Sequence, residues 1–315
     1  MAVVLADIGG TNARFALAAA DSIGTPSELA RTTYPTRAHA SLSEAVRTFL
    51  SDTHQSQVEA IYAAVAGPVV AGRAQMTNSP WQVCAAQLAA DFDTASIAVL
   101  NDFEALAYAL PLLTERDLTQ LGDCGHPPGG NRRVFAVVGP GTGLGAAGLI
   151  MAEGRPVPIV TEGGHVGFAP ETAEQMHIKT KLESRYDRVS AERLASGQGI
   201  ENIYWALSDR SLSAAEIFQR CRADEDAHAV SAVRVFFRVL GQVAGDLALA
   251  MGSLHGVYIA GGVAQKHGDL LLKSEFREGF ESKGRHRALM RDTPTFLVTH
   301  PEPGLLGAWG AGTSR

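Results

Sequence analysis

Residues 3–17 read VVLADIGGTNARFAL, and this stretch decides how the rest of the chain is interpreted. Val3–Leu5 predicts a short apolar strand with Asp7 after its end, and Ala13–Ala18 predicts a second strand. The turn between them is Gly-Gly-Thr, which carries little side-chain bulk. Backbone N–H groups in such a turn can close around an anion, Thr11 can add a donor, and Asp7 could hold Mg²⁺ through water. The stretch therefore predicts a β-hairpin with a phosphate-binding tip.

A glycine pair between apolar runs is also typical of an ordinary hairpin turn, and one copy does not separate the two interpretations. A second copy favours the phosphate site. Residues 137–150 read VVGPGTGLGAAGLI, with Thr142 in the position of Thr11, which indicates an internal duplication. A third glycine pair ends the apolar run VYIAGGV at residues 257–263. Three such turns could surround one nucleotide.

The segment LNDFEA at residues 100–105 follows a predicted strand, Ile97–Leu100. Asn101 is readily explained as the N-cap of the next helix. Asp102 is less easily explained, because it lies at the carboxyl end of a strand, where open α/β sheets bind ligands. Asp102 is therefore a candidate functional acid.

Composition excludes several classes of protein. The 315 residues are 46% hydrophobic and 19% charged, with a formal net charge of −6, so no nucleic-acid partner is predicted. The cysteines Cys84, Cys124 and Cys221 are far apart and odd in number, and the first strand begins within three residues, so we expect a cytoplasmic protein without disulfides or a signal peptide. The uncharged stretches 134–152 and 247–264 are broken by glycines and predict no membrane span.

The strings DIGGTNAR, LNDFEA, GPGTGLG, EGGHVGFAP, SAERLASGQG and YIAGGV occur in this order over nearly the whole chain. Together they resemble the bacterial glucokinases of the hexokinase, actin and Hsp70 superfamily, in the group without zinc. The resemblance implies an α/β fold of two ribonuclease-H-like (actin-like ATPase) domains flanking a cleft. We expect a small domain at residues 1–110, to which 300–315 returns, and a large domain at 111–299 with nucleotide and sugar contacts.

The resemblance also implies roles for individual residues. Asp102 matches the catalytic acid, which would accept the proton of the attacking sugar hydroxyl. Other hydroxyls would be held by Asn101, Glu162, His165 and Glu192. From the residues alone, Asn78 in the predicted turn 76–81 is a further candidate for a sugar contact, although a turn asparagine is usually satisfied by its own backbone. Glu162 and His165 flank two glycines, which allow close approach to a small polar ligand. From the residues alone, His165 could equally be a metal ligand or an ordinary loop histidine, and Glu192 could cap a turn, but there is no cysteine cluster and so no zinc site is predicted.

The same resemblance implies ATP and Mg²⁺ as cofactors. The phosphates would lie against Gly9, Gly10, Thr11 and Asn12 from one side and against Gly141 and Thr142 from the other, with Asp7 in the water shell of Mg²⁺. Gly261 and Gly262 would leave room for the adenosine. The implied activity is ATP-dependent phosphorylation of glucose to glucose 6-phosphate by a homodimer. A kinase of mannose or N-acetylmannosamine, a polyphosphate donor and a non-catalytic sugar sensor remain alternatives.

Periodicity predicts the main helices. Ser41 and Glu44 form a capping-box pattern ahead of an amphipathic helix. Spacings of three and four predict a long core helix from Ala229 to Leu254. Helices are also predicted over Val83–Ala90 and, with many charges, over Lys266–Met290. The intervening segment Asp117–Arg133 is predicted to be a loop.

Overall fold

The computed structural model describes residues 2–76 and 79–314. The chain divides into two compact units, which are described separately. The first comprises Met1–Thr114, Arg155–Pro158 and His300–Arg315, and the second comprises Glu115–Gly154 and Ile159–Thr299. Within the described residues, no helix has both the length and the apolar character needed to span a membrane.

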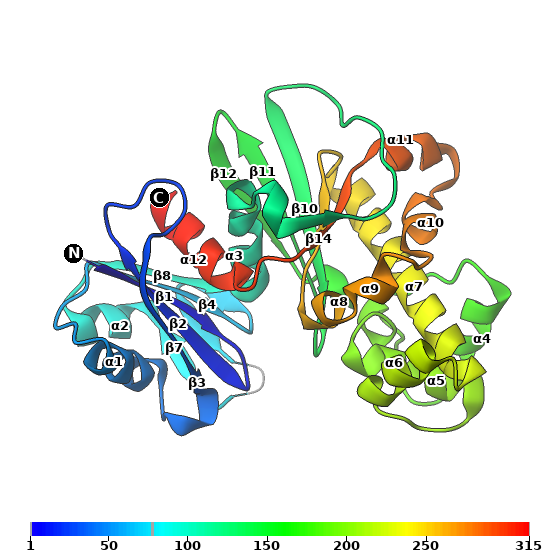
Figure 1. Cartoon of the computed structure of the whole chain (residues 1–315), viewed down its shortest axis with the longest axis horizontal. Coiled ribbons are helices and arrows are strands. Elements are labelled where there is room, and N and C mark those ends of the chain that lie inside the picture. Colours follow the sequence, from blue (N-terminus) through cyan, green and yellow to red (C-terminus); the bar gives the residue numbers. More distant parts are fainter. Residues whose placement is uncertain (1, 77–78, 315) are drawn as a thin grey trace. The chain divides into compact units, whose positions relative to one another are not determined.

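The first unit is built on a five-stranded sheet in the order β3-β2-β1-β4-β8 (Figure 1). β1 pairs antiparallel with β2 and parallel with β4, and β4 pairs parallel with β8. All six residues of β4 are buried, as expected for a parallel strand covered on both faces. The sheet strands are β1 Ala2–Ile8, β2 Asn12–Ala19, β3 Glu28–Pro35, β4 Ala60–Val65 and β8 Ser96–Asn101, and a small second sheet holds β5 Val69–Val70, β6 Arg73–Gln75 and β7 Gln82–Cys84.

Four helices cover this sheet: α1 Leu42–Asp52, α2 Ala85–Phe92, α3 Asp102–Ala109 and α12 Pro303–Thr313. Short 3₁₀ turns occupy Thr36–Ala38 and Leu110–Leu112. The capping pattern at α1 is half confirmed: the Ser41 side chain accepts the Glu44 N–H, but Glu44 accepts the N–H of Ala40 rather than that of Ser41. α12 comes from the end of the chain and packs beside α3 (Figure 1), where Gly307 lies against the carbonyl group of Ala105.

The second unit repeats this strand arrangement. Its sheet has the order β12-β11-β10-β13-β14-β9. β10 pairs antiparallel with β11 and parallel with β13, as β1 does with β2 and β4. The duplication predicted from two glycine hairpins therefore extends to the topology of both sheets. The strands of this sheet are β9 Leu118–Gln120, β10 Arg132–Pro140, β11 Leu144–Ala152, β12 Arg155–Thr161, β13 Val257–Ile259 and β14 Thr295–Val298, and the division into units assigns Arg155–Pro158 of β12 to the first unit.

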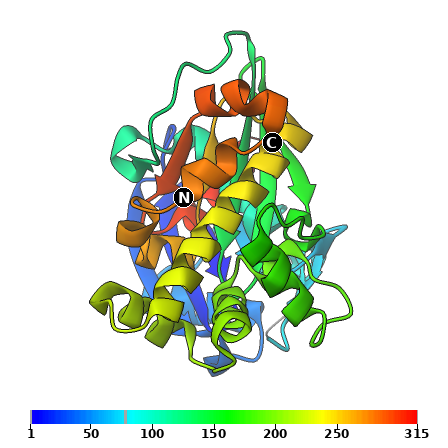
Figure 2. The same cartoon turned by 90° about the vertical axis from the view of Figure 1, so that its right-hand side faces the viewer.

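The long core helix is confirmed as α7, Ala227–Met251, which runs through the second unit (Figure 2). Asp226 caps its start by accepting the His228 N–H, and Gly252 ends it with a φ of 69°. The other helices are α4 Ala173–Leu182, α5 Gly197–Ser208, α6 Ala214–Ala223, α8 Gly262–Lys266, α9 Gly268–Leu271, α10 Phe276–Glu281 and α11 Arg287–Asp292, with 3₁₀ turns at Glu115–Asp117, Gly163–His165, Ala191–Arg193 and Gly284–His286.

Three local predictions are wrong, and strand pairing explains two of them. Val83 lies in β7 rather than in a helix, because it pairs with Ala74 of β6 and is buried there. The segment 117–133 contains β9, which forms by pairing with β14. The helix predicted over Lys266–Met290 is divided into short pieces, and Gly284, with a φ of 53°, stands at one of the breaks.

Candidate active site

The tip of the first hairpin is a hydrogen-bonded loop with exposed side chains. The N–H of Gly9 donates to the Asn12 carbonyl at 2.9 Å, and Thr36 supports the tip by donating its N–H to Thr11 O and its hydroxyl to Gly9 O. Thr11 and Asn12 are themselves exposed, and Gly9 and Gly10 are half-buried. These four predicted phosphate-binding residues therefore form one hydrogen-bonded tip, and its Thr11 and Asn12 are exposed.

Asp7 lies within β1, one residue before its end, and not beyond the strand as predicted. Its carboxylate lies 3.4 Å from Arg14 Nη1, and Arg14 Nε lies 3.4 Å from Glu302 Oε2. Gly304 approaches so closely that a Cβ there would lie 2.7 Å from Asp7 Cγ. Burial raises the pKa of Asp7 and the negative charge of Glu302 raises it further, although Arg14 acts in the opposite direction.

Asn101 and Asp102 lie where β8 passes into α3. Asn101 caps α3, because its Oδ1 accepts the N–H groups of Phe103 at 2.9 Å and Glu104 at 3.3 Å, and its amide donates to Gly67 O at 3.0 Å. The capping interpretation of Asn101 is therefore confirmed. Asp102 is the first residue of α3, and its Oδ1 accepts the Phe103 N–H at 3.0 Å.

The environment of Asp102 makes it a stronger base than an ordinary aspartate. Burial raises its pKa to about 6, and the nearby negative charge of Asp7 contributes to the increase, while the Phe103 N–H opposes it. At neutral pH most of the carboxylate is still ionised. A base with a pKa close to the working pH is well suited to accept a proton from a hydroxyl group.

The tip of the second hairpin is held from two sides. Gly141 N donates to Gly143 O at 2.8 Å, and the start of α5 contacts the tip through Gly197 N, which donates to Gly141 O at 2.8 Å. On the other side, Leu144 N donates to Glu192 Oε2 at 3.0 Å. Thr142, predicted to contact phosphate, is exposed at the tip.

The second unit brings together three of the predicted sugar-binding residues. The His165 ring nitrogens lie 3.9 Å from Glu162 Oε2 and 3.9 Å from Glu192 Oε1. Glu162 and His165 are 72% and 55% exposed, whereas Glu192 is 22% exposed. Gly164 must be a glycine here, because a Cβ at that position would lie 1.8 Å from Leu144 O. The three side chains therefore form an accessible polar cluster against the second hairpin.

The third glycine pair also reaches the second hairpin. Gly261 has a φ of 90°, and a Cβ there would lie 2.8 Å from Pro140 O, so only glycine fits both the backbone angle and the contact. Gly262 begins α8, and a Cβ added there would meet nothing within 4 Å among the described residues. Two of the three predicted glycine turns therefore lie side by side, with open space at Gly262.

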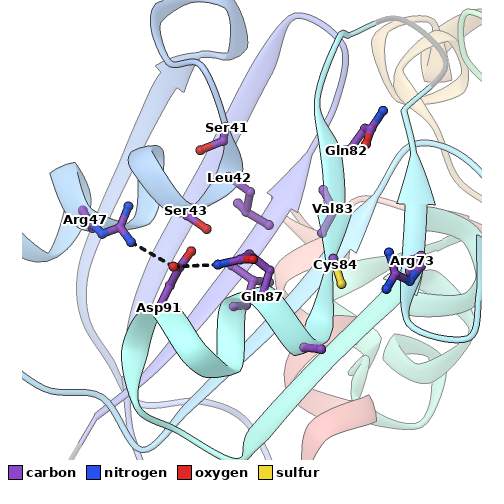
Figure 3. Close-up of a pocket in the computed structure, with 12 residues that line it drawn as sticks. Ser41, Leu42, Ser43, Arg47, Arg73, Gln82, Val83, Cys84, Gln87 and Asp91 are labelled. Atoms are coloured by element: carbon purple, nitrogen blue, oxygen red, sulfur yellow. Dashed lines mark hydrogen bonds and ion pairs between the residues drawn. The ribbon is translucent and has the colours of Figure 1, made fainter.

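Asn78 lies outside the residues that the structure describes. A hollow of about 610 Å³ nearby in the sequence is lined by α1, β6, β7 and α2, and includes Arg47, Arg73, Cys84 and Asp91 (Figure 3). Arg47 forms an ion pair with Asp91 at 3.2 Å. None of the predicted site residues within the described ranges lines this hollow. Within the same ranges, no group of three or more His, Cys, Asp or Glu residues could hold a metal ion.

Sequence reasoning did not identify four residues that contact predicted site residues within their own unit. In the first unit these are Arg14 and Glu302 beside Asp7, and Gly304 against its carboxylate. In the second unit Arg188 Nη1 donates to His165 O at 2.8 Å. Arg14 could have been found, because a tight hairpin turn places it opposite Asp7. The other three contact residues far away in the sequence, and no local pattern indicates them.

Comparisons with known proteins agree with the resemblance. The family model described as Glucokinase matches residues 4–313. The glucokinase of Stenotrophomonas maltophilia (strain R551-3) is 40% identical over 314 residues, covering 97% of this chain and 93% of its own. The "Bifunctional protein glk" of Burkholderia pseudomallei (strain 1710b) is 41% identical over 317 residues, covering 96% of this chain. The chain spans only 47% of that longer relative.

Solved structures show the same fold. The crystal structure of glucokinase from an Antarctic psychrotroph is 33% identical, with a TM-score of 0.90 and coverage of 100% of this chain and 99% of its own. A ROK family glucokinase from Streptomyces griseus, solved in complex with glucose and AMPPNP, is 20% identical, with a TM-score of 0.63 and coverage of 98% of both chains.

Proposed function

The chain belongs to the glucokinase family, and on that premise we propose that it transfers the γ-phosphoryl group of ATP to glucose, forming glucose 6-phosphate. The observation that carries the proposal is Asp102. It lies at the carboxyl end of β8, and its pKa is raised to about 6. AMPPNP, found with glucose in the Streptomyces griseus relative, is an analogue of ATP, which supports ATP as the donor.

In the proposed reaction Asp102 accepts the proton of the attacking hydroxyl as that oxygen bonds to the γ-phosphorus and the bond to the β-phosphate breaks. Glu162, His165 and Glu192 hold other hydroxyls of the sugar. Carboxylates suit this task, because a sugar presents many O–H donors and each carboxylate oxygen accepts more than one. Asn101 has its side chain committed to the α3 cap and to Gly67. A sugar contact by Asn101 would therefore use the second N–H of its amide group, while the first stays bonded to Gly67 O and the cap remains intact.

The glycine turns are proposed to bind the nucleotide. Thr11 and Asn12 on one hairpin, and Thr142 on the other, offer exposed side-chain donors for phosphate oxygens. Gly9 and Gly141 have their N–H groups bonded within the tips, and together with Gly10 they would let the phosphates come close because they carry no side chain. Gly261 and Gly262 would receive the adenosine. The open space at Gly262 supports this role, because a flat group can approach the backbone there.

The family implies Mg²⁺, and the first unit suits it. Burial is the main cause of the raised pKa of Asp7, and Arg14 at 3.4 Å lowers it, but Asp7 also interacts unfavourably with the negative charges of Glu302 and Asp102. A cation bound near Asp7 would relieve this repulsion. Mg²⁺ commonly keeps several waters and is held by one or two carboxylates together with substrate phosphates. Asp7 would hold it through water, and the ion would supply charge neutralisation on the β- and γ-oxygens.

We further propose that the protein is a cytoplasmic homodimer, as expected for this family. Light scattering after gel filtration would give twice the chain mass of 33.2 kDa for a dimer. A single-chain mass at micromolar concentration would exclude the dimer.

The function is tested by a coupled assay of ADP release with glucose, mannose and N-acetylmannosamine, and with ATP or polyphosphate as donor. We expect the highest kcat/KM with glucose and ATP. Because general-base catalysis contributes about 10²–10⁴ in rate, Asp102→Ala should lower kcat at least roughly a hundredfold while glucose binding stays measurable. Near-native turnover by this variant would remove Asp102 from the role, and a higher kcat/KM for another hexose would replace glucose as the substrate.

A further inference from the structure

Glu192 contacts both the sugar cluster and the second glycine hairpin, and each carboxylate oxygen faces one of them. Oε2 accepts the Leu144 N–H at 3.0 Å, and Oε1 lies 3.9 Å from His165 Nδ1. The carboxylate is mostly shielded from solvent, with 22% of the side chain exposed. A hydrogen bond to a charged acceptor in such a position is stronger than a neutral one. The hydrogen bond from Leu144 therefore fixes the position of the Glu192 carboxylate, and the same bond fixes the backbone of the hairpin at Leu144.

Further contacts hold these segments to each other. Ala191 N donates to Val166 O at 2.8 Å, which fixes the Glu192 segment to the loop that carries His165. Leu144 is also enclosed on its carbonyl side, where Gly164 lies in close contact. The hairpin residue Leu144 thus meets the Glu192 segment through its N–H and the His165 loop through its carbonyl.

Gly143 makes this arrangement possible. A Cβ at this position would lie 2.4 Å from Glu192 Oε2, so any side chain there would displace the carboxylate. Gly143 does not need glycine for its backbone, because its φ lies outside the left-handed region. The absence of a side chain at Gly143 is therefore explained by the room it leaves for Glu192.

We infer that Glu192 is a positioning residue for the phosphate hairpin as well as a sugar ligand, and that its bond to Leu144 couples sugar binding to nucleotide binding. This inference rests on the proposed function, which assigns sugar to the Glu192 cluster and phosphate to the hairpin. Coupling of this kind is reciprocal: a change on the hairpin must alter sugar affinity, and a change at Glu192 must alter nucleotide affinity.

The first test is Gly143→Ala, with glucose affinity measured by calorimetry in the absence of nucleotide. The added methyl group displaces the end of a flexible side chain and not the backbone, so we expect a folded protein whose glucose Kd rises about fivefold or more. Gly129→Ala is the control, because Gly129 lies in the same unit but outside the proposed sites, and a Cβ there would meet nothing within 4 Å among the described residues. The control should leave the glucose Kd within twofold of the wild type.

A hairpin that serves the nucleotide alone would give another result: Gly143→Ala would raise KM for ATP and leave the glucose Kd unchanged, which overturns the inference. If the wild type binds no glucose at all, the proposed function fails and the inference fails with it. Wild-type binding together with an unaffected Gly143→Ala variant refutes the inference alone.

A second pair of variants tests the opposite direction and does not depend on Gly143. Glu192→Gln retains an oxygen that can accept the Leu144 N–H, whereas Glu192→Ala removes the acceptor. At saturating glucose we expect KM for ATP to be at least about fivefold higher in Glu192→Ala than in Glu192→Gln. Equal values of KM for ATP would show that Glu192 does not position the hairpin.

Discussion

Asp102 combines two demands that oppose each other. Burial raises its pKa to about 6 and so strengthens it as a base, but the same burial makes the ionised form costly in the folded protein. The Phe103 N–H at 3.0 Å offsets part of that cost. A carboxylate whose pKa is raised by burial is typical of a functional site, because the burial that makes it a better base also lowers the stability of the folded protein.

The pH dependence of the reaction should report this pKa. Only ionised Asp102 can accept a proton, so kcat/KM for glucose should fall about tenfold per pH unit below pH 6 and level off above it. The measurement is initial rate against pH at low glucose, with thermal unfolding followed in parallel to exclude acid unfolding. A profile that stays flat down to pH 5 would contradict the assignment.

The free energy of unfolding should change with pH in the direction opposite to the activity: it should fall as pH rises. The folded-state pKa of Asp102 lies above its ordinary value of 3.8, so the folded state binds the proton more tightly than the unfolded state. The free energy of unfolding contributed by this group is therefore lost as pH rises from about 4 to about 6. Asp102→Asn, which carries no charge, should thus have a higher Tm than the wild type at pH 7.5, while its kcat falls. A lower Tm for Asp102→Asn would contradict this expectation, because it would show that the folded protein stabilises the ionised Asp102 carboxylate.

The cysteines should differ in reactivity. The Gln87 N–H at the start of α2 and the nearby cation Arg73 lower the pKa of Cys84, whereas burial raises the pKa of Cys221. Because the thiolate is the nucleophile, Cys84 should be alkylated several-fold faster than Cys221 by iodoacetamide at pH 7.5, measured by peptide mass spectrometry. Arg73→Gln is the control and should slow Cys84 alone. Equal rates for the two thiols would refute this prediction.

At the scale of elements, the two glycine hairpins and α12 show how small residues position the site. The hairpins are antiparallel pairs with short tips, and each is followed in its sheet by a parallel partner, β4 or β13. α12 packs closely on α3 because glycines face it: Cβ atoms at Gly307 and Gly310 would lie 1.8 Å from Ala105 O and 2.7 Å from Tyr108 O. Close packing of α12 also brings Gly304 against Asp7.

Gly307→Ala should therefore destabilise the first unit. The added methyl group meets backbone, which cannot move aside as a side chain can, so we expect a loss of ~1–3 kcal/mol or more in the free energy of unfolding. Urea denaturation followed by circular dichroism measures it. Gly129→Ala is the control, since a Cβ there meets nothing within 4 Å among the described residues. Equal midpoints for the two variants would refute the packing argument.

At the scale of the whole molecule, the first unit is completed only by the last residues of the chain. Leu305 and Trp309 of α12 are buried in one cluster with Val3 and Leu5 of β1. Trp309 also donates its ring N–H to Gly24 O at 2.7 Å. The first unit therefore cannot form its full core from residues 1–114 alone, although most of its sheet lies there.

Deletion of residues 303–315 should unfold the first unit while the second stays folded. Exposing this cluster removes apolar burial that a single unit cannot replace, and Trp309→Ala alone should cost about 3–5 kcal/mol. Near-ultraviolet circular dichroism and limited proteolysis would detect the loss of the first unit, and the second should persist as a protected fragment. A truncated chain with the wild-type unfolding midpoint would show that α12 is dispensable.

Much of this protein was predictable from short windows of sequence. The hairpins, the cap at Asn101 and the long helix α7 depend on residues close together in the chain, so local patterns of glycine, capping side chains and apolar spacing indicate them directly. The repeated Gly-Thr turns even indicated the duplication that both sheets display. These features follow from backbone conformation and hydrophobic periodicity, which are properties of neighbouring residues.

The remaining features required the tertiary structure. The pKa of Asp102 depends on burial and on Asp7, the surroundings of Asp7 depend on Glu302 and Gly304, and the bond from Leu144 to Glu192 joins residues 48 positions apart. β9 became a strand only because β14, far away in the chain, paired with it. Burial, electrostatic potential and strand pairing arise between segments distant in the chain, so no local window of sequence contains them.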